Sequence, residues 1–175
     1  MRKVDVKGQD NLAAAYVSTH DLPILAGWWN GADIREKHDL GLIDGRQADH
    51  ADSGRTREKT MLVDLLREPA LLTKNVDVAH PMPMSVAVAV HGFVCATPCP
   101  AGSGPGGRPA GEAVAVNLPG TDRERPNWRR RIDTDDSALC RTPLAEAILS
   151  ALRPPATDMT AACNTALDSG EIGRC

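Results

Sequence analysis

The chain has 175 residues, which is enough for one ordinary domain, and its 42% hydrophobic and 25% charged composition is typical of a globular protein. The formal net charge of −3 gives no reason to expect a nucleic-acid partner. No run of about 18 apolar residues is present, so no membrane span is predicted. The first residues lack the apolar stretch of a signal peptide, which favours a cytoplasmic protein. The five cysteines match no zinc pattern, and we expect neither a metal ion nor an organic cofactor.

The first predicted element is a strand. Residues 12–18, "LAAAYVS", are continuously apolar and short, as in a strand that is buried on both faces. The tripeptide "THD" follows directly. The next residues, "LPILAGWWNG", predict the first turns of a helix, with Asp21 as its cap, Pro23 at an early helical position and Gly31 at its end.

Helical patterns dominate the next part of the chain. Residues 33–44 are loosely helical, and residues 48–72 predict a longer helix. Pro69 ends or bends this longer helix. Its apolar residues form a stripe along one face: Met61, Leu62, Leu65 and Leu66. The segment "MSVAVAVHGFVCATP", residues 84–98, is ambiguous, because its β-branched alternation indicates a strand while its alanines and its length also permit a buried helix. His91 within it is expected to be a core histidine.

The last part of the chain combines loops with two further elements. Residues 99–111 are dominated by Gly and Pro and predict a flexible insert. Residues 112–121, "EAVAVNLPGT", predict a second buried strand that ends in a Pro-Gly turn. "TPLAEAILSALRPP" predicts a helix that Thr142 caps and Pro143 begins. We therefore divide the chain into a structured part, residues 1–153, and an unstructured tail, residues 154–175. The order of strand, turn, helices, strand, turn and helix is typical of parallel βα units and predicts an α/β fold.

Two clusters of polar residues follow the predicted strands. His20 and Asp21 could bind substrate at a strand end, and Trp28 and Trp29 could stack on a sugar ring, but the alternative is a helix cap and two core tryptophans. Asn117 could bind hydroxyl groups or satisfy its own turn. Residues 129–131, three arginines, could form an anion site, although a solvated face is the more usual role of such a run.

Three stretches resemble a known family. "STHDLPILAGWW" (18–29), "VNLPGTDRERPNWRRRI" (116–132) and "PLAEAI" (143–148) resemble the C-terminal part of the 4-alpha-glucanotransferases, also called amylomaltases or disproportionating enzymes. The resemblance covers roughly residues 10–153 and keeps the order of the motifs and a spacer of family-like length. It implies a (β/α)8 (TIM) barrel, of which this chain would supply the last two or so βα units and would therefore be incomplete.

The resemblance also implies a reaction. Members of the family transfer α-1,4-glucan segments between maltooligosaccharides, or to glucose, by a retaining double displacement that uses a nucleophilic carboxylate and a carboxylic acid/base. A third carboxylate favours the oxocarbenium-like transition state. Carried over to this chain, Asp21 is the transition-state stabiliser, His20 binds the sugar, and Asn117 contacts a substrate subsite.

The chain also departs from the family. About twenty residues precede Asp21, and neither Asp5 nor Asp10 lies in a motif of the family's other two carboxylates. We therefore expect activity to require a missing N-terminal portion of the barrel, and the isolated chain to be inactive. The alternatives are a truncated or frameshifted remnant without catalytic activity and a weak α-glucan-binding module.

Overall fold

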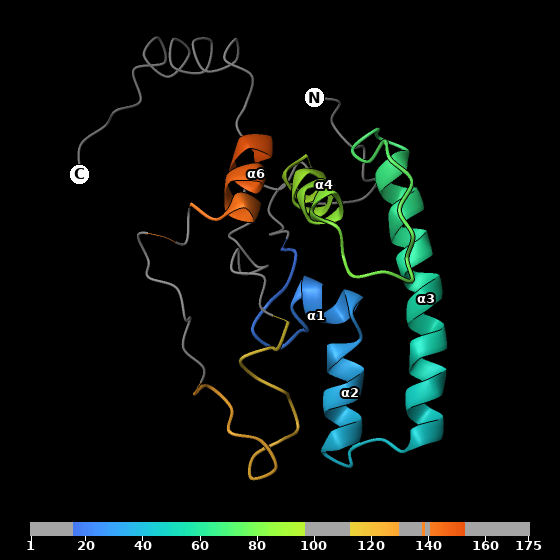
Figure 1. The fold of residues 1–175 in the computed structure, drawn as a ribbon. Coiled ribbons are helices and arrows are strands. Elements are labelled where there is room, and N and C mark those ends of the chain that lie inside the picture. Colours follow the sequence, from blue (N-terminus) through green and yellow to red (C-terminus); the bar gives the residue numbers. More distant parts are fainter. Residues whose placement is uncertain (1–15, 97–112, 130–137, 139–140, 153–175) are drawn as a thin grey trace, which may run out of the picture.

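The computed structural model describes residues 16–96, 113–129, 138 and 141–152. Its helices are α1 (Leu25–Trp29), α2 (Ala32–Asp39), α3 (Gly45–Arg67), α4 (Met84–Cys95) and α6 (Pro143–Leu152). The long helix α3 runs beside α2, and α4 packs against α6 at one end of the molecule (Figure 1). The predicted insert, residues 99–111, and the predicted tail, residues 154–175, lie outside the described residues.

Local signals fix helix ends in α3 and α6. Asp44 caps α3 with a complete capping box: its side chain accepts a hydrogen bond from the backbone of Gln47, whose side chain accepts one from the backbone of Asp44. The helix ends at Arg67, two residues before Pro69, as predicted. The Thr142 hydroxyl accepts a hydrogen bond from Ala145 N at 3.2 Å, which confirms the predicted cap of α6.

The ambiguous segment is a helix. Residues 84–95 form α4, and the helix buries most of its small and β-branched side chains. A helix satisfies its backbone groups internally, whereas a strand at this place would need neighbouring strands. His91 is buried, as predicted, and its Nδ1 lies 2.7 Å from Ala87 O; its Nε2 has no hydrogen-bond partner among the described residues.

The two predicted strands are not confirmed. Within the described residues, 113–121 have no strand pairing, so the strand predicted for 112–121 requires correction. Residues 16–18 have none either, but residues 12–15 of the strand predicted for 12–18 lie outside the described residues. The physical reason is that a strand exists only through hydrogen bonds to a neighbour, and the described part of the chain offers neither segment such a neighbour. Both segments pass beside α1 as irregular backbone (Figure 1).

The core lies between α1, α3 and α4. Its buried members are Trp29, Val63, Leu66, Leu72, Val86, Ala89 and Val90. The predicted apolar stripe on α3 is only partly confirmed: Leu66 is buried, but Met61 is 71% and Leu65 45% exposed. Helix α4 covers only one side of α3, so the apolar residues on the other side of α3 stay exposed among the described residues.

Both tryptophans of α1 serve packing. Trp29 is fully buried and donates its indole N–H to His80 O at 3.0 Å, and Trp28 packs against the same core. The Arg55 guanidinium lies over Trp28, with Cζ 4.8 Å from the ring centroid. The interpretation of these two residues as core, rather than as a platform for sugar, is therefore the correct one.

Arg55 joins α3 to α2. Its guanidinium donates two hydrogen bonds to the Asp33 carboxylate, at 2.9 and 2.8 Å, and a third to Trp28 O. Burial by itself would lower the pKa of Arg55, but the hydrogen bonds and charge of Asp33, together with Glu58, raise that pKa above its ordinary value. Arg55 is therefore a permanent cation that fixes α2 in place.

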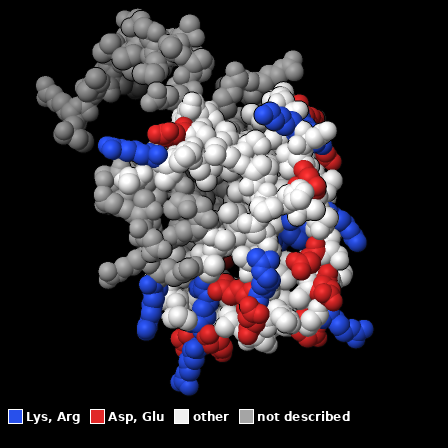
Figure 2. Space-filling view, viewed as in Figure 1, with Lys and Arg blue, Asp and Glu red and all other residues white. Residues whose placement is uncertain are grey.

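Charged side chains of both signs gather over α2 and the beginning of α3. Figure 2 shows them interspersed, with no large patch of one sign on this face of the described residues. In the described part of the chain, no helix is both long enough and apolar enough to span a bilayer.

Candidate functional site

His20 and Asp21 lie on a turn that precedes α1. The Ser18 hydroxyl donates a hydrogen bond to Pro23 O at 3.0 Å, which closes the turn. Helix α1 begins only at Leu25, and its N-cap, Ile24, has extended backbone and no side-chain cap. The prediction that Asp21 caps this helix is therefore wrong. Because the helix begins four residues after Asp21, the carboxylate is available for other partners.

The second half of the site is the segment of residues 113–129, which a buried arginine organises. Arg125 is 6% exposed, and its Nε lies 2.7 Å from the Glu36 carboxylate of α2. The same guanidinium donates hydrogen bonds to Val116 O at 3.2 Å and to Ala115 O. Arg125 thus holds the backbone just before Asn117 against α2.

Asn127 fixes the other side of the same segment. Its side-chain oxygen accepts hydrogen bonds from Leu118 N at 3.1 Å and from Arg125 at 2.7 Å, and its amide donates to Thr121 O at 2.9 Å. The next residue, Trp128, donates its backbone N–H to Val116 O at 2.9 Å. These bonds enclose Asn117 in a loop that is held by hydrogen bonds from its own side chains and backbone.

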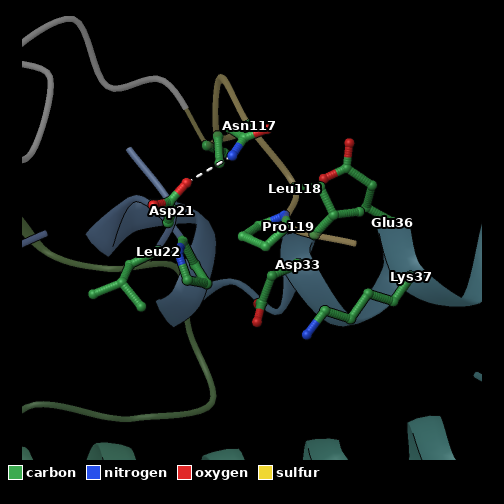
Figure 3. Close-up of a pocket in the computed structure, with 11 residues that line it drawn as sticks. Asp21, Leu22, Asp33, Glu36, Lys37, Asn117, Leu118 and Pro119 are labelled. Carbon is green, nitrogen blue, oxygen red and sulfur yellow. Dashed lines mark hydrogen bonds between the residues drawn. The ribbon is translucent and has the colours of Figure 1, made fainter. Parts of the chain in front are cut away.

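The two halves meet at Asp21. Asn117 Nδ2 donates a hydrogen bond to Asp21 Oδ1 at 2.6 Å, across 96 residues of sequence (Figure 3). His20 Nε2 lies 3.1 Å from Asp21 Oδ2, and its ring lies 5.3 Å from the Trp128 ring, centroid to centroid. The structure therefore brings the three residues selected from the sequence together and adds Trp128 beside them.

A cavity of about 240 Å³ opens next to Asp21. Residues of the turn, of α2 and of the second segment line it: Asp21, Leu22, Pro23, Asp33, Glu36, Lys37, Ala113, Ala115, Asn117, Leu118 and Pro119 (Figure 3). Three of these carry carboxylates, but Asp33 is paired with Arg55 and Glu36 with Arg125. Asp21 instead contacts an amide and an imidazole. Among the described residues, Asp21 is therefore the carboxylate of this cavity that is not paired with an arginine.

Metal binding finds no support in the described part of the chain. No group of three or more His, Cys, Asp or Glu side chains there is arranged to hold an ion. Of the arginines at 129–131, Arg129 is exposed, and the other two lie outside the described residues, so the anion site remains a prediction.

Arg125, Asn127 and Glu36 organise the site but are not among the residues that the sequence analysis singles out. The arginine run at 129–131 drew attention instead, because a cluster is visible in a sequence and a single buried arginine is not. The "RPNW" stretch, in which Arg125 and Asn127 flank a proline, is the signal that was available. Nothing in the sequence indicated that Glu36, 89 residues away, is the partner of Arg125.

The chain is similar to known proteins both in sequence and in fold. The family model described as 4-alpha-glucanotransferase matches residues 3–136. The 4-alpha-glucanotransferases of Mycobacterium bovis and Mycobacterium tuberculosis are each 30% identical over 113 residues, which is 65% of this chain and 15% of theirs. The crystal structure of amylomaltase from Corynebacterium glutamicum has a similar fold, with a TM-score of 0.68 and 20% identity over 79% of this chain and 21% of that one. The chain spans about 15% of the length of these curated relatives. Because the family model covers well over half of the residues, this chain belongs to the 4-alpha-glucanotransferase family.

Proposed function

We propose that this chain forms part of the substrate site of a 4-alpha-glucanotransferase, in which Asp21 stabilises the positive charge that develops on the reacting sugar. The observation that carries the proposal is the 2.6 Å hydrogen bond between Asn117 and Asp21, which joins two motifs 96 residues apart beside a cavity. The substrate is an α-1,4-glucan or maltooligosaccharide, as the activity named for the relatives suggests.

The contacts of Asp21 suit this role. One carboxylate oxygen accepts the Asn117 amide and the other faces His20, so both oxygens have fixed positions. A pre-oriented anion stabilises an oxocarbenium-like transition state without reorganising as the charge appears. Because no arginine pairs with this carboxylate among the described residues, its negative charge remains available to stabilise the positive charge that develops on the sugar. His20 and Asn117 supply hydrogen-bonding groups for hydroxyls.

The remaining chemistry belongs to groups outside this site. A retaining transfer needs a carboxylate nucleophile and a carboxylic acid/base about 5–5.5 Å apart. We place both in barrel strands that correspond to the part of the relatives beyond the matched 15%. The 175 residues by themselves therefore bind or orient substrate but do not transfer glucan.

The test is a chimera in which this chain replaces the matching section of the Mycobacterium tuberculosis relative. We expect the chimera to release glucose from maltotriose, and Asp21→Asn to lower its kcat by about 10²–10³-fold, as when one electrostatic stabiliser is lost. Asp39→Asn is the matched control, because Asp39 lies at the end of α2 with 80% of its side chain exposed. An Asp21→Asn chimera as active as the control would disprove the role of Asp21. Glucose release by the 175-residue chain alone would disprove the need for the other carboxylates.

A further inference from the structure

Trp128 differs from the other two tryptophans of the chain. Trp29 is completely buried and Trp28 packs against the core, but Trp128 is 61% exposed. A single exposed apolar side chain needs no explanation by itself. The position and the backbone of Trp128 supply the further evidence.

The backbone of Trp128 is strained. Its φ of 62° lies in the left-handed region, which a bulky residue rarely adopts. The loop holds it there: the Trp128 N–H is bonded to Val116 O, and the preceding Asn127 is anchored through its side chain to Leu118 and Thr121. A strained residue that its surroundings fix in place is a reason to look for a functional role.

The Trp128 ring continues the row of site residues. Asn117 contacts Asp21, Asp21 contacts His20, and the His20 ring lies 5.3 Å from the Trp128 ring at an interplanar angle of 47°. An amide, a carboxylate, an imidazole and an indole are therefore linked by successive contacts, the first two at the cavity and the last two beside it. His20 and Asp21 are exposed like Trp128, and Asn117 is half-buried. A ligand that lies along this row meets polar groups at one end and a flat apolar face at the other.

A sugar unit matches this arrangement. The hydroxyls of a glucose unit exchange hydrogen bonds with carboxylate, amide and imidazole groups, and its C–H face is apolar and suits an aromatic ring. A nucleotide could also stack on the indole, but its phosphate would approach the Asp21 carboxylate and be repelled. The row therefore favours a neutral sugar over an anionic aromatic ligand such as a nucleotide.

We propose that Trp128 is a sugar-binding residue, which stacks on a glucose unit of the α-glucan at the His20 side of Asp21. The inference rests on the proposed function for the identity of the sugar, and it adds a contact that determines how tightly the glucan is held. Trp128 touches no reacting atom in this scheme, so it changes binding and KM and leaves the chemical step to Asp21.

The experiment uses the full 175-residue chain and maltoheptaose at millimolar concentrations, with saturation-transfer NMR to detect contact and calorimetry to measure Kd. We expect transfer from indole protons to the ring C–H protons of glucose. Trp128→Ala should weaken binding by about tenfold or more, as when one aromatic stacking platform is removed. Trp128→Phe keeps a ring and should lose only a few-fold. Trp28→Phe is the control and should bind like the wild type.

Each outcome decides the inference. Circular dichroism confirms that the variants are folded, and Trp128→Phe remains informative if the alanine variant does not fold. Undetectable binding of maltoheptaose by the wild type, or equal binding by Trp128→Ala and the wild type, would overturn the inference. Binding that depends on Trp128, together with a chimera that Asp21→Asn leaves fully active, would overturn the proposed function and keep the sugar site. The reverse pattern would keep the function and reject Trp128.

Discussion

Replacing two glycines by alanine should have opposite effects on stability. A Cβ at Gly27, in α1, would lie 1.8 Å from Ala113 O and 2.8 Å from Ala113 C. Both atoms belong to backbone, so no side chain can rotate away, and the second segment has to move off α1. A Cβ at Gly54, inside α3, would have no atom within 4 Å. The added methyl group therefore clashes with the backbone of Ala113 when it is placed on α1, and it has free space when it is placed on α3.

The magnitudes follow from these contacts. Extra volume in a packed contact typically costs about 1–3 kcal/mol, and alanine gains about 0.5–1 kcal/mol over glycine in a helix. Gly27→Ala should therefore destabilise the fold by about 1–2 kcal/mol, which lowers the Tm by about 3–6 °C for a chain of this size. Gly54→Ala should stabilise it by about 0.5–1 kcal/mol and raise the Tm by about 1–3 °C.

Thermal unfolding followed by circular dichroism measures both changes. A second readout is the NMR signal of the Asn117 side-chain amide, because its hydrogen bond to Asp21 depends on the segment that Gly27→Ala displaces. That signal should shift in Gly27→Ala and stay in place in Gly54→Ala. Equal Tm changes of the same sign in the two variants would refute the reasoning, since only the close approach to Ala113 separates them.

Three further predictions concern single side chains. Arg125→Ala should lower the free energy of unfolding by about 3 kcal/mol, because it leaves Glu36 without its buried partner. Arg123 is exposed, so Arg123→Ala should change that free energy by no more than about 0.5 kcal/mol in the same urea titration. Burial and the charge of Arg55 lower the pKa of Lys59. Between that lowered pKa and the ordinary lysine value of 10.5, the unfolded chain therefore binds more protons than the folded one. The free energy of unfolding should rise with pH in this range, and Lys59→Met should remove the rise. Thr142→Ala should lose about 1 kcal/mol of stability with the cap of α6, and an unchanged melting curve would contradict this.

Sequence reasoning located most helices, because their signals are local. The Thr142-Pro143 start of α6 and the Pro69 stop of α3 depend only on neighbouring residues, and both are confirmed. The 84–98 segment could not be decided locally, since its apolar pattern fits a strand and a buried helix equally well. The strands at 12–18 and 112–121 depend on pairing partners elsewhere, which a local pattern cannot supply.

The candidate site, like the fold, is only partly predictable from the sequence. Asp21, His20 and Asn117 were selected because they follow predicted strands and match family motifs, and the structure brings them together. Asp21 does not cap α1, because the helix begins four residues later at Leu25, and the Asp21 carboxylate is bound instead by Asn117, 96 positions away. Arg125 was missed because its role is set by Glu36, which no spacing in the sequence identifies.

Stability and site geometry are coupled in this chain through one segment. Gly27 allows Ala113 to approach α1, and Arg125 ties Ala115 and Val116 of the same segment to Glu36 of α2. Asn117 lies between these two anchors and therefore reaches Asp21 only if both hold. A substitution at Gly27 or Arg125 touches neither side chain of the Asn117–Asp21 pair, yet it should loosen that pair together with the fold. Variants at these anchors should thus lose maltoheptaose binding and stability in parallel, whereas Trp128→Ala should lose binding while the melting temperature stays nearly constant.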